Sequence, residues 1–400
     1  MDKPIVSLAR NENIELAVIQ ALDQIKLPNL NNKTILLKPN VGREVGPKLG
    51  VNTNPDVVSA VFNYLNSRFE AKFLLGDSPI INTDTNKAFI SSGYSNLINN
   101  NKLQYIDLDD PPPITLKIPK GRVIKDIKVT GYWNEIDCII SIPVLKMHMH
   151  CGASLSFKNL KGIIYKRNKI KLHHLQFPEI IAQLKPNLNK VKELDIAISD
   201  LSHIIKPELV IIDASYALEG MGPSSGNKVK MDTIIASNNF LAADIIALAL
   251  TRQDWSLNDV PHLKLISELG KKNPKSYRDI VTIPEDFQKF KRNLEAPPTT
   301  ITIKYNNVRF ISEQACSACL STVTNLLKNN IEFIEENYTS DNPLRIAIGK
   351  GLNESDLYED TFLIGNCTAN NKDSGIFIKG CTPVESSIID IIRKKIEERK

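Results

Sequence analysis

The sequence predicts an α/β fold, with a largely parallel or mixed sheet flanked by helices, followed by a smaller α+β domain at the C-terminal end. Short apolar runs alternate with segments whose apolar residues recur at helical spacing, which is typical of α/β folds. The 400 residues exceed what one hydrophobic core usually supports. We therefore expect two domains, residues 1–285 and 300–400, separated where the chain turns polar and proline-bearing between Pro284 and Thr300.

Each element of the first domain is predicted from an apolar pattern. Helical spacing predicts helices over 18–25, 55–65 and 240–250, the second opened by Asn54 as its N-cap and Pro55 at its first helical position. Continuous apolar runs predict strands at 34–37, 71–75, 137–144, 208–212 and 231–236. Strands that alternate with helices pair mostly in parallel.

Composition and charge exclude several classes of partner. The 50 basic and 45 acidic residues leave a net charge of +5, which is too balanced to indicate nucleic-acid binding. No apolar run approaches the ~20 residues of a membrane span, and the start Met1-Asp2-Lys3 shows no apolar signal segment. We expect a cytoplasmic protein whose partners include neither nucleic acid nor a membrane.

Polar residues follow several predicted strands at the point where each strand ends. Lys38-Pro39-Asn40 follows one run, Gly76-Asp77-Ser78 the next, Lys146-Met147-His148 a third, and Asp213 a fourth. In open α/β sheets ligands bind at the carboxyl ends of the strands. These residues are therefore expected to converge on one crevice.

The residue types at this crevice suit a small anionic ligand. Lysine ammonium groups bind carboxylate or phosphate, and His148 suits a general acid or base near neutral pH. We predict His148, Lys146 and Asp77 as catalytic residues. The predicted ligand-binding residues are Lys38, Asn40, Lys158, Asn159, Lys161, Asp213 and Glu219. Taken singly, each has a structural alternative, such as a solvated lysine or a carboxylate that only forms a turn.

Two further histidine groups remain open. His148, His150 and Cys151 permit a metal site, because residues 148 and 150 share one face if this segment is a strand, although spacing indicates no third ligand beyond this cluster. His173 and His174 receive no assigned role.

The cysteines of the second domain are the strongest chemical signal in the chain. Cys316, Cys319, Cys367 and Cys381 form a C-x2-C-x47-C-x13-C arrangement. Helical spacing after the first pair places both sulfurs at the start of a helix, where a thiolate is favoured. The last two cysteines follow apolar runs and glycines, which places them where strands end.

Four thiolates select zinc or an iron-sulfur cluster. A structural zinc site usually has two short C-x2-C pairs, whereas the second half here is open, so we favour a [4Fe-4S] cluster. A four-thiolate zinc site, a dithiol redox couple and simply buried cysteines remain alternatives, and disulfides are disfavoured by a reducing compartment. Cys138, inside an apolar run, is interpreted as a core residue.

The motifs together resemble the domain of unknown function 362, a set of uncharacterised iron-sulfur center proteins. The resemblance runs from about Lys33 to Asp244 and continues in the cysteine pattern, although Cys381-Thr382-Pro383 stands where Cys-Pro-Pro is expected. The matching motifs are Lys38-Pro39-Asn40, Thr53-Asn54-Pro55, Gly76-Asp77-Ser78, Lys146-Met147-His148, 158–162, Asp213 and 219–223.

The resemblance implies a cytosolic [4Fe-4S] protein and names no reaction. A more distant similarity of the N-terminal part to lactate-racemase-type proteins transfers no site. Our leading hypothesis is a redox enzyme that acts on a small anionic ligand and exchanges electrons with a partner. The alternatives are a non-redox isomerase or lyase, and a ligand-binding protein whose cluster or zinc ion is structural.

Overall fold

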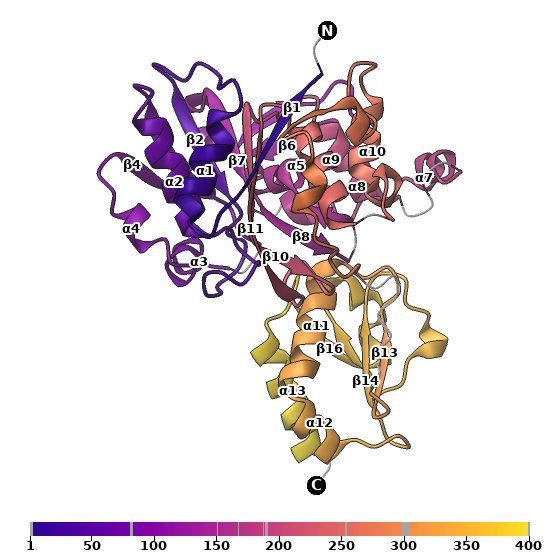
Figure 1. Cartoon of the computed structure of the whole chain (residues 1–400). Helices are drawn as coiled ribbons and strands as arrows, with labels where there is room; N and C mark the ends of the chain where they lie inside the picture. The colour runs from indigo at the N-terminus through magenta and orange to yellow at the C-terminus, as the bar shows by residue number, and fades with distance from the viewer. Residues whose placement is uncertain are drawn as a thin grey trace. The chain divides into compact units, whose positions relative to one another are not determined.

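The computed structural model describes residues 3–80, 83–149, 151–166, 168–186, 188, 191–252, 254–297 and 305–398. The chain divides into two compact units (Figure 1). The larger comprises residues 1–220 and 226–297, and the smaller comprises residues 221–225 and 298–400.

The larger unit is built on a ten-stranded mixed sheet in the order β12-β1-β11-β10-β7-β2-β3-β4, with β8 beside β10 and β9 beside β8. Pairing is parallel from β10 through β7, β2 and β3 to β4, and antiparallel between β1, β11 and β10. The predicted fold class is confirmed. The strands are β1 (Ile5–Arg10), β2 (Thr34–Pro39), β3 (Lys72–Asp77), β4 (Leu103–Asp107), β7 (Cys138–Ile142), β8 (Val144–His148), β9 (Gly152–Ser154), β10 (Leu209–Glu219), β11 (Asn227–Ser237) and β12 (Val281–Ile283).

Helices cover both faces of this sheet (Figure 1). The α-helices are α1 (Ile14–Asp23), α2 (Pro55–Asn66), α3 (Thr85–Ser91), α4 (Ser95–Ile98), α5 (Ser156–Asn159), α6 (Asn168–Lys171), α7 (Pro178–Leu184), α8 (Glu193–Leu201), α9 (Phe240–Thr251) and α10 (Pro261–Glu268). The 3₁₀ turns are η1 (Gly131–Glu135), η2 (Leu160–Ile163), η3 (Leu257–Asp259), η4 (Tyr277–Asp279) and η5 (Phe287–Phe290), and β5 (Ile114–Lys117) pairs with β6 (Asp126–Val129) in a separate sheet.

Two hydrophobic cores lie on opposite faces of the sheet. On β10, Ile211 belongs to the core that contains α1 and α2, whereas Val210 and Ile212 belong to the core that contains α8, α9 and α10. This alternation follows from the two-residue period of a strand, and it makes the unit a three-layer structure. Cys138 is buried in the first of these cores, in agreement with its interpretation as a core residue.

The predicted strand at 137–144 is instead two strands, β7 and β8, separated at Pro143. Proline has no backbone N–H and cannot donate within a central ladder. The carbonyl of Pro143 accepts from the backbone N–H of Asp213 at 2.8 Å. β7 continues the parallel sheet, while β8 pairs with β9 and with the later part of β10.

The smaller unit contains a four-stranded sheet in the order β13-β14-β15-β16. All three strand pairs are parallel, so this unit is an α/β layer where the sequence predicted α+β. Parallel neighbours need long crossovers, and α11 and α12 supply the one between β13 and β14. The elements are β13 (Val308–Ile311), α11 (Ser317–Asn329), α12 (Ile331–Asn337), β14 (Leu344–Ile348), η6 (Glu354–Asp356), β15 (Phe362–Ile364), η7 (Asn366–Ser374), β16 (Ile376–Ile378) and α13 (Glu385–Glu397).

Across the residues given above, no helix is both long and apolar enough to cross a bilayer.

Candidate functional site

The carboxyl ends of β2 and β3 bring Lys38 and Asp77 into contact. Lys38 is fully buried, and its Nζ donates to Asp77 Oδ1 at 2.6 Å and to Asn159 Oδ1 at 3.2 Å. Burial lowers the pKa of Lys38, and the charge of Asp77 opposes that shift. Asp77 also accepts from the backbone N–H groups of Val41 and Ser78, both at 2.8 Å. The pair is therefore a buried ion pair that is held by several hydrogen bonds.

Gly162 gives the ion pair its space. A Cβ atom at this position would overlap the Asp77 carboxylate and would lie 2.5 Å from Lys38 Nζ. Contacts this short do not occur in folded proteins, so any larger residue would displace the pair. Close packing against the ion pair thus explains why glycine ends the predicted motif 158–162.

Helix α5 ends at Asn159, whose side chain contacts Lys38. The Nδ2 group of Asn159 donates to the Lys38 carbonyl at 3.0 Å and to Ser141 Oγ at 3.2 Å. At the other end of α5, the carboxylate of Asp244 accepts from the backbone N–H groups of Ser156 and Phe157, at 2.9 and 3.3 Å. Burial raises the pKa of Asp244 to about 7. Asp244 is a positioning residue that the sequence reasoning missed, although a lone carboxylate within an otherwise apolar helix is a signal that could have found it.

Lys146 on β8 is a second buried cation. Its Nζ donates to Asn40 Oδ1 at 2.6 Å and to the Val51 carbonyl at 2.8 Å, and the residue is 6% exposed. Burial, together with the charges of Lys158 and Arg43, lowers the pKa of Lys146 to about 7. Both acceptors are neutral, in contrast to the carboxylate that faces Lys38.

A loop after β2 positions these acceptors. Thr53 Oγ1 accepts from the backbone N–H of Asn40 at 2.8 Å and donates to the Ile142 carbonyl at 2.7 Å. The backbone N–H of Asn54 donates to Asp213 Oδ2 at 2.8 Å, and Ser215 Oγ donates to Asp213 Oδ1 at 2.6 Å. Burial raises the pKa of Asp213 to about 6. In this structure Asp213 holds the loop, and the side chain of Asn54 caps α2.

The remaining predicted residues differ in their burial and in their contacts. His148 is buried two residues beyond Lys146 on the same strand, so both side chains point to one face. Lys161 Nζ lies 3.2 Å from His173 Nε2. Lys158 is partly exposed on α5. His150 lies outside the described residues, and burial raises the pKa of the Cys151 thiol to about 11.

Glu219 is at the far end of β10 from Asp213. A strand rises ~3.3 Å per residue, so the six positions between them correspond to ~20 Å. Glu219 Oε2 accepts from the backbone N–H of Glu295 at 2.9 Å. Its closeness to Asp213 in the sequence therefore does not translate into closeness in space.

Two cations near the site were not predicted. Arg43 lies in the loop after β2, and burial lowers the pKa of its guanidinium. Lys169 is buried, donates to the carbonyls of Ser78 and Pro79 at 2.8 and 3.0 Å, and has its pKa lowered to about 8 by burial. Both lie in segments without a periodic pattern, so the sequence offers no signal for them.

Residues 35–249 match the family described as "Domain of unknown function (DUF362)". This span is more than half of the 400 residues. It contains Lys38, Lys146 and the residues described above that contact them. The chain belongs to the DUF362 family.

Relatives of this DUF362 chain include the thylakoid-associated protein sll1697 of Synechocystis sp., which is 26% identical over 263 residues, 62% of this chain and 75% of that one. Among solved structures, the lactate racemase apoprotein of Thermoanaerobacterium thermosaccharolyticum aligns over 62% of this chain and 58% of its own length, with 14% identity and a TM-score of 0.38. A protein from Thermotoga maritima aligns over 60% of each chain, with 14% identity and a TM-score of 0.36.

The four cysteines of the smaller unit lie outside the segment that matches DUF362. Cys316 is the N-cap of α11, and Cys319 lies in its first turn. Cys367 follows β15 at the start of η7, and Cys381 follows β16. These helix and strand ends agree with the sequence prediction. All six cysteines are described, and none forms a disulfide.

The thiols of this group interact with one another. Hydrogen bonds with Cys316 and Cys367 raise the pKa of Cys319, and the hydrogen bond with Cys319 lowers the pKa of Cys367 to about 7. Burial, together with the neighbouring Cys316 and Cys367, raises the pKa of Cys381 to about 11. As they stand, no three or more His, Cys, Asp or Glu side chains of the described residues are grouped to hold a metal ion.

Glycine leaves room beside these sulfurs. Gly365 has φ of 100°, and a Cβ atom there would lie 3.2 Å from Cys319 Sγ and 3.6 Å from Cys367 Sγ. Its backbone N–H donates to the Ile378 carbonyl at 2.9 Å, which ties the turn to the end of β16. The backbone thus approaches the sulfurs closely at the ends of two neighbouring strands.

Proposed function

We propose that this protein is a redox enzyme of the cytoplasm. In this proposal the larger unit binds a small anionic ligand through Lys38, Lys146 and Lys158, and Cys316, Cys319, Cys367 and Cys381 of the smaller unit bind a [4Fe-4S] cluster. An electron-transfer partner would exchange electrons with the cluster. The family itself supplies no reaction, so the proposal depends on the chemistry of these two groups of residues.

The buried ammonium of Lys146 is the observation that carries the proposed anion site. Burial of an ammonium without a carboxylate is costly, and its two hydrogen-bond acceptors, Asn40 Oδ1 and the Val51 carbonyl, are both neutral. Lys158 and Arg43 add like charge, whereas Asp77 is already paired with Lys38. A carboxylate or phosphate placed against Lys146 would offset this excess of positive charge.

The residues of the proposed anion site would have different roles in binding and proton transfer. The Lys38–Asp77 pair, held by Asn159, would fix the ends of β2 and β3 and contribute a preorganised charge. Lys146 would bind and orient the anion, and His148, on the same face of β8, would donate or accept the proton. Asn40 would hold the Lys146 ammonium in place.

The chemistry of the cysteines supports the cluster. Four thiols are soft ligands, and Gly365 leaves space beside two of the sulfurs. The thiols hydrogen-bond to one another, so they would have to move apart to admit a bulky cluster. When bound, a [4Fe-4S] cluster supplies one-electron transfer.

Two experiments test the proposal. Protein purified without oxygen is assayed for iron, acid-labile sulfide and an electron paramagnetic resonance signal, and reversible bleaching by dithionite is expected. Colourless protein with stoichiometric zinc would refute the cluster. A cluster that dithionite leaves unchanged would refute the redox role and favour a structural one.

The anion site is tested separately by calorimetry with inorganic phosphate and malonate as probes. Lys146→Gln is expected to weaken binding about 10- to 100-fold, the loss typical of a charge-assisted hydrogen bond. Lys271→Gln, which removes an exposed lysine, is the matched control. Equal affinity in both variants would refute the site, whatever the iron content.

A further inference from the structure

The loop that follows β2 is fixed by hydrogen bonds to the side chain of Asn52. Asn52 Oδ1 accepts from the backbone N–H of Gly42 at 3.0 Å, and Asn52 Nδ2 donates to the carbonyl of Arg43 at 2.7 Å. Asn52 is itself buried and donates to Ser92 Oγ at 2.7 Å. The backbone that carries Arg43 is therefore held in one place, three residues beyond the asparagine that contacts Lys146.

The ammonium groups of Lys146 and Lys158 retain donors that the described part of the chain does not use. An ammonium has three N–H donors, and among the described residues Lys146 finds two acceptors, Asn40 Oδ1 and the Val51 carbonyl. Within the same residues, the ammonium of Lys158 makes no hydrogen bond or ion pair. Buried donors are nearly always hydrogen-bonded, so the third N–H of Lys146 is available to a ligand atom.

Positive charge exceeds negative charge around Lys146. Burial, together with the charges of Lys158, Arg43 and Lys38, lowers the pKa of its ammonium, and the charge of Asp77 opposes this shift. Asp77 is hydrogen-bonded to Lys38 at 2.6 Å, so these two charges largely cancel. Three cationic side chains remain to be offset by a ligand, and a single negative charge would offset only part of them.

A ligand can reach these groups from solvent. Asn40, Arg43 and Lys158 are each partly exposed, whereas Lys146 is 6% exposed. A Cβ atom at Gly42, between Asn40 and Arg43, would meet nothing within 4 Å, so the loop borders open space. A ligand can therefore approach over the partly exposed groups and place one end against Lys146.

We propose that the anion site binds a dianionic phosphate monoester and that Arg43 binds its second negative charge. The inference rests on the proposed function, which requires only a small anion. The guanidinium fork of Arg43 matches two phosphate oxygens, and Lys146 and Lys158 provide ammonium donors for the third. A phosphate monoester is dianionic above its second pKa of about 6, and it places both charges on one group.

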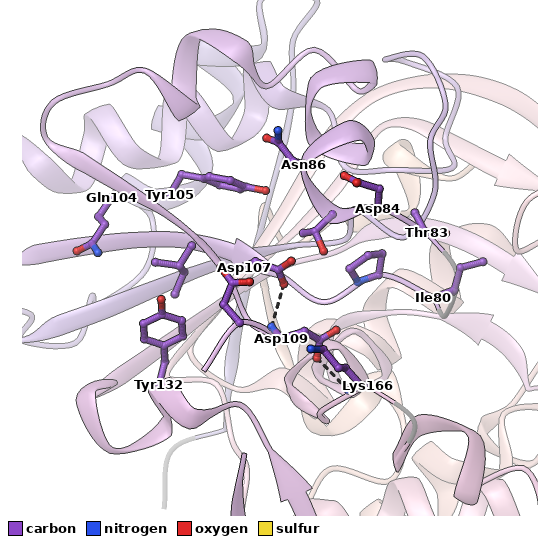
Figure 2. Close-up of a pocket in the computed structure, with 14 residues that line it drawn as sticks. Ile80, Thr83, Asp84, Asn86, Gln104, Tyr105, Asp107, Asp109, Tyr132 and Lys166 are labelled. Carbon is purple, nitrogen blue, oxygen red and sulfur yellow. Dashed lines mark hydrogen bonds between the residues drawn. The ribbon is translucent and has the colours of Figure 1, made fainter. Parts of the chain in front are cut away.

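A separate cavity carries the opposite charge. It has a volume of about 640 Å³ and lies at the carboxyl ends of β3 and β4 (Figure 2). Its lining includes four aspartates and one lysine: Asp84, Asp107, Asp109, Asp110 and Lys166. An acidic surface repels anions, so a phosphate monoester is not expected to bind there.

The experiment is calorimetry of the full chain at pH 7 with methyl phosphate and with acetate, which is a monoanion. Wild type is expected to bind methyl phosphate roughly tenfold or more tightly than acetate. Arg43→Gln is expected to weaken methyl phosphate binding about 10- to 100-fold and acetate binding less than about threefold. Arg43→Lys, which keeps the charge without the fork, should give an intermediate affinity for methyl phosphate.

Lys166→Gln is the matched control, because it removes an exposed cation from the acidic cavity and should leave methyl phosphate affinity unchanged. If it weakened methyl phosphate binding as much as Arg43→Gln, the phosphate would bind outside the anion site and the inference would be wrong.

The remaining outcomes separate this inference from the proposed function. Equal wild-type affinities for methyl phosphate and acetate would overturn the preference for a dianion and leave the anion site in place. Equal weakening of both ligands in Arg43→Gln would overturn the role of Arg43 in binding the second charge. If normally folded protein, checked by thermal unfolding, bound neither anion, the anion site and this inference would both be refuted.

Discussion

The ammonium of Lys146 and the side-chain oxygen of Asn40 are joined by a hydrogen bond of 2.6 Å between strand β8 and the end of β2. Although the ammonium is buried, its hydrogen-bond acceptor here is a neutral amide and not a carboxylate. The pKa of Lys146, about 7, follows from burial and from neighbouring positive charge. Lys146 is therefore poised to change its protonation when an anion arrives.

Anion binding at pH 8.5 is expected to take up close to one proton per chain. Free Lys146 is mostly neutral at this pH, and a bound anion raises its pKa because an opposite charge favours the ammonium. Asp213 and Asp244, with pKa values of about 6 and 7, are already ionised and contribute little. Lys169, with a pKa of about 8, is partly protonated at this pH, and a variant of Lys146 separates its contribution. Phosphate titrations in two buffers of different ionisation enthalpy measure the uptake.

Lys146→Met supplies the control for this experiment. Any phosphate that the variant still binds should be bound without the extra proton. If the variant takes up the same number of protons as wild type, another group titrates and the assignment to Lys146 is wrong.

Gly162→Ala is expected to destabilise the protein by about 2–4 kcal/mol, because a Cβ atom there would overlap Asp77 and crowd Lys38. Anion binding should fall with it, since the ion pair must shift. Gly42→Ala is the matched control, because a Cβ atom at Gly42 would meet nothing within 4 Å. Chemical denaturation of the two variants should separate them clearly.

Part of this site follows from the sequence. Lys38 and Asp77 end neighbouring strands, and parallel strands present their carboxyl ends at one edge, so their meeting was predictable. Arg43 lies in an irregular loop and Lys169 in the short helix α6, and the paths of both segments depend on tertiary contacts. Glu219 was predicted to join the same crevice, but β10 continues for six residues beyond Asp213 and places Glu219 at its far end.

Titration of Asp244 is expected to make the free energy of unfolding depend on pH. Its folded pKa of about 7 lies above the usual carboxyl value, so the folded state binds more protons than the unfolded state between pH 4 and 7. The stability contributed by this group is full below pH 4 and is lost as the pH rises through 7. Compared with Asp244→Asn, wild type should lose on the order of 4 kcal/mol across this range.

Urea denaturation of wild type and Asp244→Asn at pH 4.5, 6 and 7.5 measures that difference. The variant retains an oxygen that can accept from the backbone N–H of Ser156, so the α5 cap is not simply deleted. A difference in unfolding free energy that stays constant with pH would mean that Asp244 titrates in its ordinary range.

Serine at Cys316, Cys319, Cys367 or Cys381 is expected to lower the iron and sulfide content of anaerobically purified protein, because each thiolate would be one of four ligands. Cys138→Ala is the matched control, since Cys138 is buried in the core of the larger unit and should leave iron unchanged. The four cysteines differ in how much their substitution is expected to affect folding. Cys319 is buried in the first turn of α11, so its substitution can also reduce folding, whereas Cys381 is partly exposed. Cys381→Ser is therefore the decisive variant: full iron content in this folded variant would remove Cys381 from the ligand set.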